Sequence, residues 1–426
     1  MQIHLSYGKN GLDVEVPEGN LRGVLTYAPA DPMADPVQAV RDGLANPIGT
    51  RPLAEAAQGK RNACIVVCDI TRPVPNAVLL PPILEALEEG GISREQVTVL
   101  IATGTHRPNE GAELDTILGA ELAQSLRVVN HVCTDRESHR HFGESPNGVP
   151  VYLDKTYTEA DVRITVGLIE PHFMAGYSGG RKLIMPGIAA LETIQAWHSP
   201  RFLEHPNATN GITDGNPVHE ENTAIASLCP PDLIVDCTLD EEKRITGVFV
   251  GEMVAAWREG VRFAAGCVRA TIPEPVDIVV TSSAGFPLDA TFYQTVKGMV
   301  GALPIVKPGG SIIIASECSE GIGGPHFQKL LFDTEDLGEL MVAMQSDGWE
   351  YVPDQWQVEE LAKATRRNRV YLVSSGIPAA TAALLFVTPM PTVEAALTDA
   401  LTRHGNDATI AVIPKGPYVI AAVAPE

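Results

Sequence analysis

The first half of the chain alternates between continuous apolar runs and segments in which apolar residues recur at helical spacing. Three apolar runs have the length of buried strands: residues 62–70, 96–102 and 162–170. Residues 76–89 are amphipathic and end at Gly90 and Gly91, as a helix does, and residues 109–124 predict a more polar helix. Strands that alternate with helices in this way predict an α/β fold with a mostly parallel sheet.

The same alternation begins again after a proline-rich stretch at residues 271–276. Further strands are predicted at residues 276–283, 311–316, 369–374 and 409–414. Further helices are predicted at residues 289–303, 336–345, 357–366 and 392–404. We therefore expect two α/β domains, residues 1–272 and 273–426, with the active site in the cleft between them.

Composition narrows the possible partners. The chain has 426 residues and a formal net charge of −22, which argues against nucleic-acid binding and against an anionic membrane surface. No apolar run approaches the ~18 residues of a membrane span, and the N-terminus does not resemble a signal peptide. Seven cysteines, an odd number, favour reduced thiols, so we expect a cytoplasmic protein.

Reactive side chains follow each of the three apolar runs in the first half. Asp69, Thr71 and Arg72 follow the first, His106 follows the second and His172 follows the third. In a parallel sheet, ligands bind beyond the carboxyl ends of the strands. We therefore expect these side chains to converge on one site.

The segment after the third run is rich in glycine. A strand followed by such a turn and a short helix is typical of a phosphate site, because backbone N–H groups face the anion. Ser178 lies in a G-x-S-x-G pattern, but about eight residues separate it from the strand, which disfavours the nucleophile elbow of a hydrolase. Arg181 and Leu183 break the pattern of an ATP-binding loop, so only a looser phosphate cradle remains.

Two residues of this segment have more than one interpretation. Lys182 can hold a phosphate by charge alone, or it can be a covalent tether or a Schiff-base lysine. His198 ends a short predicted helix, where its simplest role is to cap the helix dipole. The residues alone leave both choices open.

Further candidate polar residues lie outside this segment. His139 and His141 have the spacing of a zinc-binding pair, but they lie among charged residues without a matching ligand pattern, so we expect a solvated loop. Gln294 and Lys297 share one face of a predicted helix and are placed to reach the cleft.

His106 and His172 together suggest a reaction class. A racemase or epimerase needs two bases on opposite sides of one carbon, and imidazole titrates near working pH. Arg72 is suited to a substrate carboxylate, because a guanidinium can bind both of its oxygens.

Several motifs occur in an order that resembles one known family across nearly the whole chain. They are D-x-T-R-P at 69–73, T-G-T-H-R at 103–107, E-P-H-x-x-A-G-Y-S-G-G-x-K at 170–182, P-G at 186–187, W-H at 197–198, Y-Q-x-x-K at 293–297 and D-Q-W-Q at 354–357. Together they resemble the nickel-dependent lactate racemase family.

This resemblance implies a nickel-pincer nucleotide, a pyridinium mononucleotide that binds nickel through two sulfur atoms and a carbon and accepts a hydride. It implies that Lys182 tethers the nucleotide, although some relatives hold it without a covalent link, and that His198 is a nickel ligand. It also implies cofactor-synthesis proteins as partners. The substrate would be a small 2-hydroxy acid, whose side chain the motifs do not identify.

The resemblance also implies roles for the remaining site residues. His106 and His172 would be the catalytic acid and base, and Gln294 and Lys297 would bind the substrate. The cofactor would be lined by Asp69, Thr71, Arg72, Ser178, Gly179 and Trp356. Two other functions stay open: a protein that carries the nickel nucleotide or a phosphate ligand without turnover, and a serine hydrolase that uses Ser178.

Overall fold

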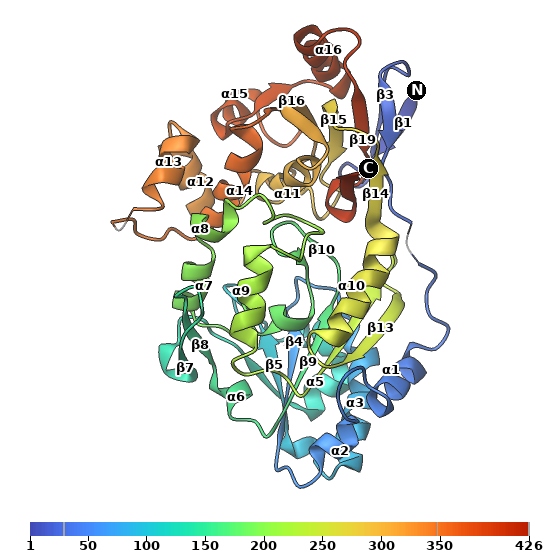
Figure 1. Cartoon of the computed structure of the whole chain (residues 1–426), viewed down its shortest axis with the longest axis vertical. Coiled ribbons are helices and arrows are strands. Elements are labelled where there is room, and N and C mark those ends of the chain that lie inside the picture. The colour runs from blue at the N-terminus through green and yellow to red at the C-terminus, as the bar shows by residue number, and fades with distance from the viewer. Residues whose placement is uncertain (29, 347, 425–426) are drawn as a thin grey trace.

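The computed structural model describes residues 1–28, 30–346 and 348–424. Figure 1 shows two lobes stacked along the long axis, with most of the first part of the chain in the lower lobe and the last part in the upper one. Each lobe is built on a six-stranded sheet. The expected α/β fold with two domains is confirmed.

The sheet of the lower lobe has the order β13-β12-β9-β4-β5-β6. Its strands are β4 (Ala63–Cys68), β5 (Val97–Ala102), β6 (Arg127–Asn130), β9 (Val162–Leu168), β12 (Leu233–Leu239) and β13 (Ile245–Gly251). All neighbours are parallel except β12 and β13. The three apolar runs of the sequence are the central strands β9, β4 and β5, so the polar residues that follow them emerge at one edge.

Helices surround this sheet. They are α1 (Pro36–Ala45), α2 (Leu53–Ala57), α3 (Asn76–Glu89), α4 (Ala112–Leu118), α5 (Ala120–Ser125), α6 (Lys155–Thr158), α7 (Leu191–Trp197), α8 (Pro200–Leu203), α9 (Pro217–Ala226) and α10 (Ala255–Val268). Helix α3 has the predicted bounds. The single helix predicted at residues 109–124 is two helices, because Gly119 between them has a φ of 86°, which does not continue a right-handed helix.

The sheet of the upper lobe has the order β18-β17-β16-β15-β19-β3, and all neighbours are parallel. Its strands are β3 (Leu21–Val24), β15 (Val276–Ser282), β16 (Val306–Ala315), β17 (Arg369–Val373), β18 (Thr388–Met390) and β19 (Ile410–Ile413). Its helices are α11 (Phe292–Ala302), α12 (Pro325–Asp333), α13 (Leu337–Ala343), α14 (Gln355–Thr365), α15 (Ala379–Ala382) and α16 (Val393–His404).

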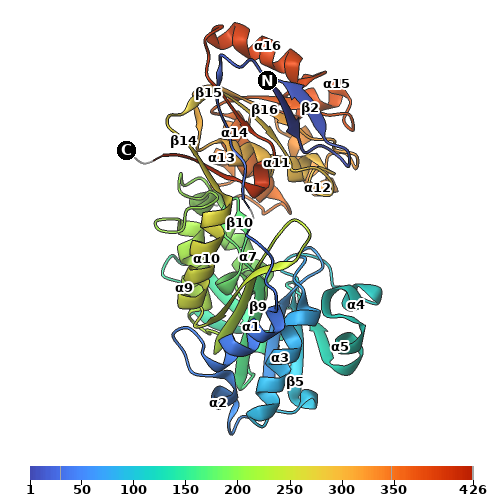
Figure 2. The same ribbon diagram turned by 90° about the vertical axis from the view of Figure 1, so that its right-hand side faces the viewer.

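The N-terminal residues belong to the upper lobe, and Figures 1 and 2 both show them there. Strands β1 (Gln2–Leu5) and β2 (Leu12–Glu15) form a hairpin, and β3 pairs with β19. Leu5 is buried in the same core as Ile278 and Val280. The division at residue 272 therefore assigned this segment to the wrong lobe, because an alternating strand pattern does not specify which sheet its apolar face covers.

Short strand pairs complete the structure. They are β7 (His139–Glu144) with β8 (Pro150–Asp154), β10 (Pro171–His172) with β11 (Gly176–Tyr177), and β14 (Arg269–Ile272) with β20 (Ile420–Val423). Within the described ranges, no helix is long and apolar enough to cross a membrane.

Candidate active site

A cavity of about 280 Å³ lies between the strand ends of the lower lobe and helices α11 and α14 of the upper lobe. Every residue predicted for the site lines it: Asp69, Thr71, Arg72, His106, His172, Ser178, Gly179, Lys182, His198, Gln294, Lys297 and Trp356. The structure therefore brings together residues that are more than 280 positions apart in the chain.

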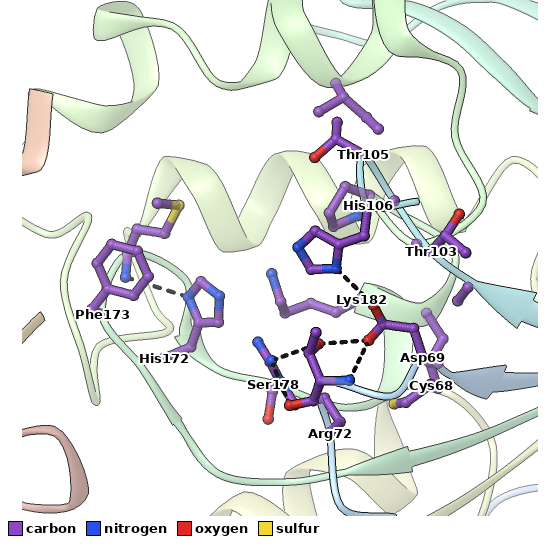
Figure 3. Close-up of a pocket in the computed structure, with 18 of the residues that line it drawn as sticks. Cys68, Asp69, Arg72, Thr103, Thr105, His106, His172, Phe173, Ser178 and Lys182 are labelled. Carbon is purple, nitrogen blue, oxygen red and sulfur yellow. Dashed lines mark hydrogen bonds and ion pairs between the residues drawn. The ribbon is translucent and has the colours of Figure 1, made fainter. Parts of the chain in front are cut away.

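His106 is oriented by the carboxylate at the end of β4. Its Nδ1 lies 2.6 Å from Oδ2 of Asp69, and the hydroxyl of Thr71 donates to the other carboxylate oxygen at 2.6 Å (Figure 3). Burial alone would raise the pKa of Asp69, but the hydrogen bonds from His106 and Thr71 hold it below its usual value. An ionised Asp69 accepts from an N–H on Nδ1 of His106, so in the neutral form of this ring Nε2 is the proton acceptor.

His172 is held in the opposite way. Its Nδ1 accepts hydrogen bonds from the backbone N–H groups of Ala175 at 3.2 Å and Met174 at 3.4 Å. Burial, followed by the charges of Lys182 and other nearby cations, lowers the pKa of His172 well below its usual value. The ring is therefore neutral, with its proton on Nε2.

These two histidines present complementary groups to the same cavity. Figure 3 shows His106 and His172 on different chain segments, with Lys182 near both in this view. His106 offers a lone pair, whereas His172 offers an N–H. One residue is thus prepared to take a proton and the other to donate a hydrogen bond.

Three backbone amides of the glycine-rich turn are held by bonds within the protein. The N–H of Gly180 donates to Asp236 at 2.7 Å, that of Ser178 to the Glu170 carbonyl at 2.9 Å, and that of Lys182 to the Gly179 carbonyl at 3.1 Å. The turn also directs side chains into the cavity from the 3₁₀ helix η3 (Gly180–Leu183), and the phosphate cradle stays a prediction.

Among the described residues, the amine of Lys182 has no acidic partner. Within the described part of the chain its Nζ makes no ion pair, and it lies 5.5 Å from the centre of the Trp197 ring. Burial and then the charges of Arg181 and Arg72 lower the pKa of Lys182 well below its usual value. A lowered pKa gives the amine a neutral, nucleophilic fraction at ordinary pH.

His198 follows helix α7, and its ring is held between two tryptophans. The ring centroids of Trp197 and Trp356 lie 4.0 and 4.8 Å from that of His198. Its Nδ1 is buried and has no hydrogen-bond partner among the described residues. A ring that capped the helix would bond to a carbonyl at the helix end, so the structure does not favour the capping interpretation.

The upper lobe supplies Gln294 and Lys297 from one face of α11. Burial and then the charge of Arg72 lower the pKa of Lys297 to about 8. The Nε of Arg72 lies 3.2 Å from a carboxylate oxygen of Glu170, which balances one of the positive charges. The Oε1 of Gln294 is buried without a partner among the described residues.

Ser178 is not placed to act as a nucleophile. Its hydroxyl donates to the Leu168 carbonyl at 2.6 Å and accepts from the Glu170 N–H at 3.0 Å. No histidine or carboxylate in the described ranges is bonded to this hydroxyl. The hydrolase interpretation is therefore wrong, and Ser178 instead fixes the turn against the end of β9.

His139 does not lie in a solvated loop, as the charged surroundings had suggested. It begins β7 and is buried, with its Nε2 3.0 Å from Nε2 of His131. His141 is exposed and stacks on Tyr152 at a ring separation of 4.4 Å. Residues two apart in a strand share a face, so the difference in burial comes from their neighbours: His139 lies against His131, whereas His141 stacks on Tyr152.

Several residues that support the site were not identified as candidates. Asp236, in the middle of β12, has its pKa raised by burial to about 7 and holds the turn at Gly180. The hydroxyl of Tyr293 accepts a hydrogen bond from Trp356 at 3.0 Å, and Gln357 donates to the Tyr293 carbonyl. The single aspartate within the apolar run LIVDCTL is a sequence signal for Asp236. Tyr293 and Gln357 belong to the Y-Q-x-x-K and D-Q-W-Q motifs.

Comparison with known proteins agrees with this geometry. Residues 7–211 match the family model for the lactate racemase N-terminal domain, and residues 272–421 match that for the C-terminal domain. The chain belongs to the lactate racemase family. This membership makes it an isomerase.

Two relatives in this family match over almost the whole chain. The lactate racemase of Thermoanaerobacterium thermosaccharolyticum is 35% identical, with 98% of each chain covered. The lactate racemase of Lactiplantibacillus plantarum is 34% identical, with 98% of this chain and 99% of the relative covered.

Solved structures agree in fold. The lactate racemase apoprotein from T. thermosaccharolyticum superposes with a TM-score of 0.92 at 34% identity and covers 99% of this chain and 100% of the other. A protein from Thermotoga maritima, at 18% identity, has a TM-score of 0.68 over 93% of this chain and 100% of the other. The second match supports the fold alone.

Proposed function

We propose that this enzyme racemises lactate or a closely related short 2-hydroxy acid. The observation that carries the proposal is a pair of histidines in one cavity with opposite hydrogen bonds at Nδ1: that of His106 faces a carboxylate, and that of His172 accepts from backbone N–H groups. The same cavity also holds Arg72 and Lys297. A 2-hydroxy acid has a hydroxyl proton to exchange and a carboxylate to bind, and this arrangement serves both.

The carboxylate of the substrate would be bound by Arg72 and Lys297. Arg72 is already oriented by Glu170, and Lys297 reaches the cavity from the opposite lobe. The unsatisfied Oε1 of Gln294 would accept a hydrogen bond from the substrate or from water. Because the contacts come from both lobes, substrate binding would hold the lobes together over the site.

The residues present also fit the nickel-pincer nucleotide that the family resemblance implies. His198 has a buried imidazole nitrogen without a partner in the described part of the chain, as a metal ligand would before binding, and Lys182 has an amine available for a covalent bond. Trp356 would pack beside the group. When bound, it would supply an acceptor for the hydride that leaves C2 of the substrate. Cofactor-synthesis proteins would be the partners that deliver it.

The histidines would move the hydroxyl proton. With one enantiomer, His106 Nε2 would take the proton, and the resulting imidazolium would be stabilised by Asp69. His172 would serve the opposite enantiomer. In its present tautomer, Nε2 of His172 already carries a proton. Nε2 can accept the substrate's proton only in the other tautomer, in which the ring proton is on Nδ1. That change would break the hydrogen bonds from Ala175 and Met174, and a shift of the 172–175 turn would therefore accompany turnover.

The experiment is a racemisation assay on protein produced together with the cofactor pathway. Pure L- or D-lactate is converted and both enantiomers are followed with time. His106→Ala and His172→Ala should each slow both directions by roughly 10²–10⁴-fold. His141→Ala, which changes an exposed histidine outside the cavity, is the control and should leave the rate unchanged.

Two outcomes would refute parts of the proposal. Protein that holds nickel but converts no 2-hydroxy acid in a panel of chiral substrates would indicate a carrier without turnover. Racemisation in D2O tests the hydride route, because the C2 hydrogen should then remain unlabelled. Deuterium entry at C2 at the rate of racemisation would instead indicate proton removal from carbon.

A further inference from the structure

A second cluster of ligating side chains lies behind the wall of the cavity and takes no part in the proposed reaction. His131, His139 and Asp154 are 0%, 4% and 3% exposed. They come from the segment after β6, the start of β7 and the end of β8. One ligating atom from each lies within 4.8 Å of the others.

The hydrogen bonds around His139 fix the position of its proton. Its Nδ1 lies 2.8 Å from the carbonyl oxygen of Asp135, which can only accept. The Ser138 hydroxyl lies 3.1 Å from the same Nδ1 and donates its own proton to the Asp135 carbonyl at 2.7 Å. Nδ1 of His139 therefore carries the proton, and its Nε2 is a bare lone pair.

The same reasoning applies to His131. The Thr103 hydroxyl lies 2.7 Å from the carbonyl oxygen of His131, which can only accept, so the hydroxyl proton points there. Thr103 Oγ1 is then an acceptor for Nδ1 of His131, 3.2 Å away. When the proton of His131 is on Nδ1, its Nε2 is also bare, and two lone pairs face each other across 3.0 Å.

In this arrangement the two lone pairs repel each other, and a cation bound to both nitrogens removes the repulsion. A divalent metal ion satisfies both nitrogens without changing any surrounding hydrogen bond. The outer N–H groups are already bonded to oxygen, as they are in histidines that bind metal.

We propose that His131, His139 and Asp154 bind a divalent transition-metal ion, of which zinc is the best match, at a structural site separate from the substrate cavity. Two imidazole nitrogens and one carboxylate oxygen are ligands that zinc prefers, and water would complete the coordination. Two neutral rings and one carboxylate carry a charge of −1, which a divalent cation more than balances.

The position of the site suggests what it does. Thr103 bonds to His131 and also lines the cavity, and its carbonyl accepts from the N–H of His106 at 2.8 Å. The N–H of Asp154 donates to the carbonyl of Ile188 at 3.0 Å, next to Gly187 in the cavity wall. A metal ion here would join the β7–β8 hairpin to two walls of the cavity, and so hold the segment that carries His106.

The test uses apoprotein made in cells without the cofactor pathway, stripped with a chelator and titrated with zinc. We expect about one zinc per chain and a melting temperature that rises with zinc. Asp154→Asn keeps the side-chain oxygen that accepts from Thr156 N–H at the start of α6 but removes the charge. This variant and His139→Ala should weaken zinc binding about tenfold or more.

Two controls separate this site from others. His141→Ala, which changes an exposed position of the same strand, should bind zinc as the unchanged protein does. His198→Ala should also keep this zinc, because it alters only the cavity. Apoprotein that takes up no zinc, or zinc that is bound equally well by Asp154→Asn and His139→Ala, would overturn the proposal. Either result would leave the proposed racemase function unaffected.

Discussion

Asp69→Asn tests how the structure prepares His106. The substitution keeps the size of a side chain that is 5% exposed and removes its charge. Asp69 has two effects on His106: it fixes the proton on Nδ1, and it stabilises the charge that forms when Nε2 takes a proton. Asparagine cannot stabilise the charge on the ring. It also no longer fixes the proton on Nδ1 if its amide turns its N–H toward the ring.

The two effects set the size of the expected loss. A hydrogen bond to a charged group contributes about 1.5–3 kcal/mol, which corresponds to a roughly 10- to 150-fold lower rate. If the tautomer also changes, the whole contribution of a general base is lost, and the decrease reaches about 10²–10⁴-fold. We therefore expect kcat to fall by at least about tenfold, with little change in KM, because Asp69 lies behind His106 and is not a proposed carboxylate ligand.

The assay is initial-rate racemisation of both lactate enantiomers by cofactor-loaded protein. Asp161→Asn is the matched control. It removes a carboxylate that pairs with exposed Arg61 at 3.0 Å, far from the cavity in the same lobe, and should leave kcat unchanged. Nickel content should be equal in all three proteins. An Asp69→Asn enzyme with kcat within threefold of the unchanged protein would refute the idea that Asp69 prepares His106.

Three further predictions follow from the site and the fold. Because the pKa of Lys297 is lowered to about 8, kcat/KM should fall as the pH rises above 8 and the lysine loses its charge. Lys297→Arg stays charged and should show no such fall. If the pH profile of Lys297→Arg is the same as that of the unchanged enzyme, Lys297 is not the group that titrates. Intact mass of the loaded enzyme should exceed the sequence mass by a nucleotide-sized adduct that Lys182→Ala lacks, whereas a fully active enzyme of unmodified mass would exclude the tether. Leu5→Ala should lower the free energy of unfolding of the upper lobe by about 2–5 kcal/mol in denaturant titrations, because Leu5 is 0% exposed in its core. Glu18→Ala, at an exposed position, is the control. Equal stability of the two variants would contradict the placement of the N-terminal hairpin.

The sequence by itself determined the central strands of the lower lobe and the edge of their sheet where the site lies. Buried parallel strands are continuous apolar runs, so β4, β5 and β9 were predicted from local pattern alone, as was α3. The polar residues that follow those strands meet because neighbouring parallel strands end together. The order of the motifs then indicated the family, which the comparisons confirm.

Tertiary structure decided what depends on contacts between distant residues. The alternation in β1 and β2 predicts an apolar face, but only packing shows that this face covers the upper sheet. His139 and His141 are equivalent in the sequence, yet one is buried against His131 and the other is exposed. Burial and hydrogen-bond partners come from other segments, and they also set the tautomers of His106 and His172. Because a proton's position depends on these partners, local pattern identifies the catalytic candidates and the folded structure defines what each one can do.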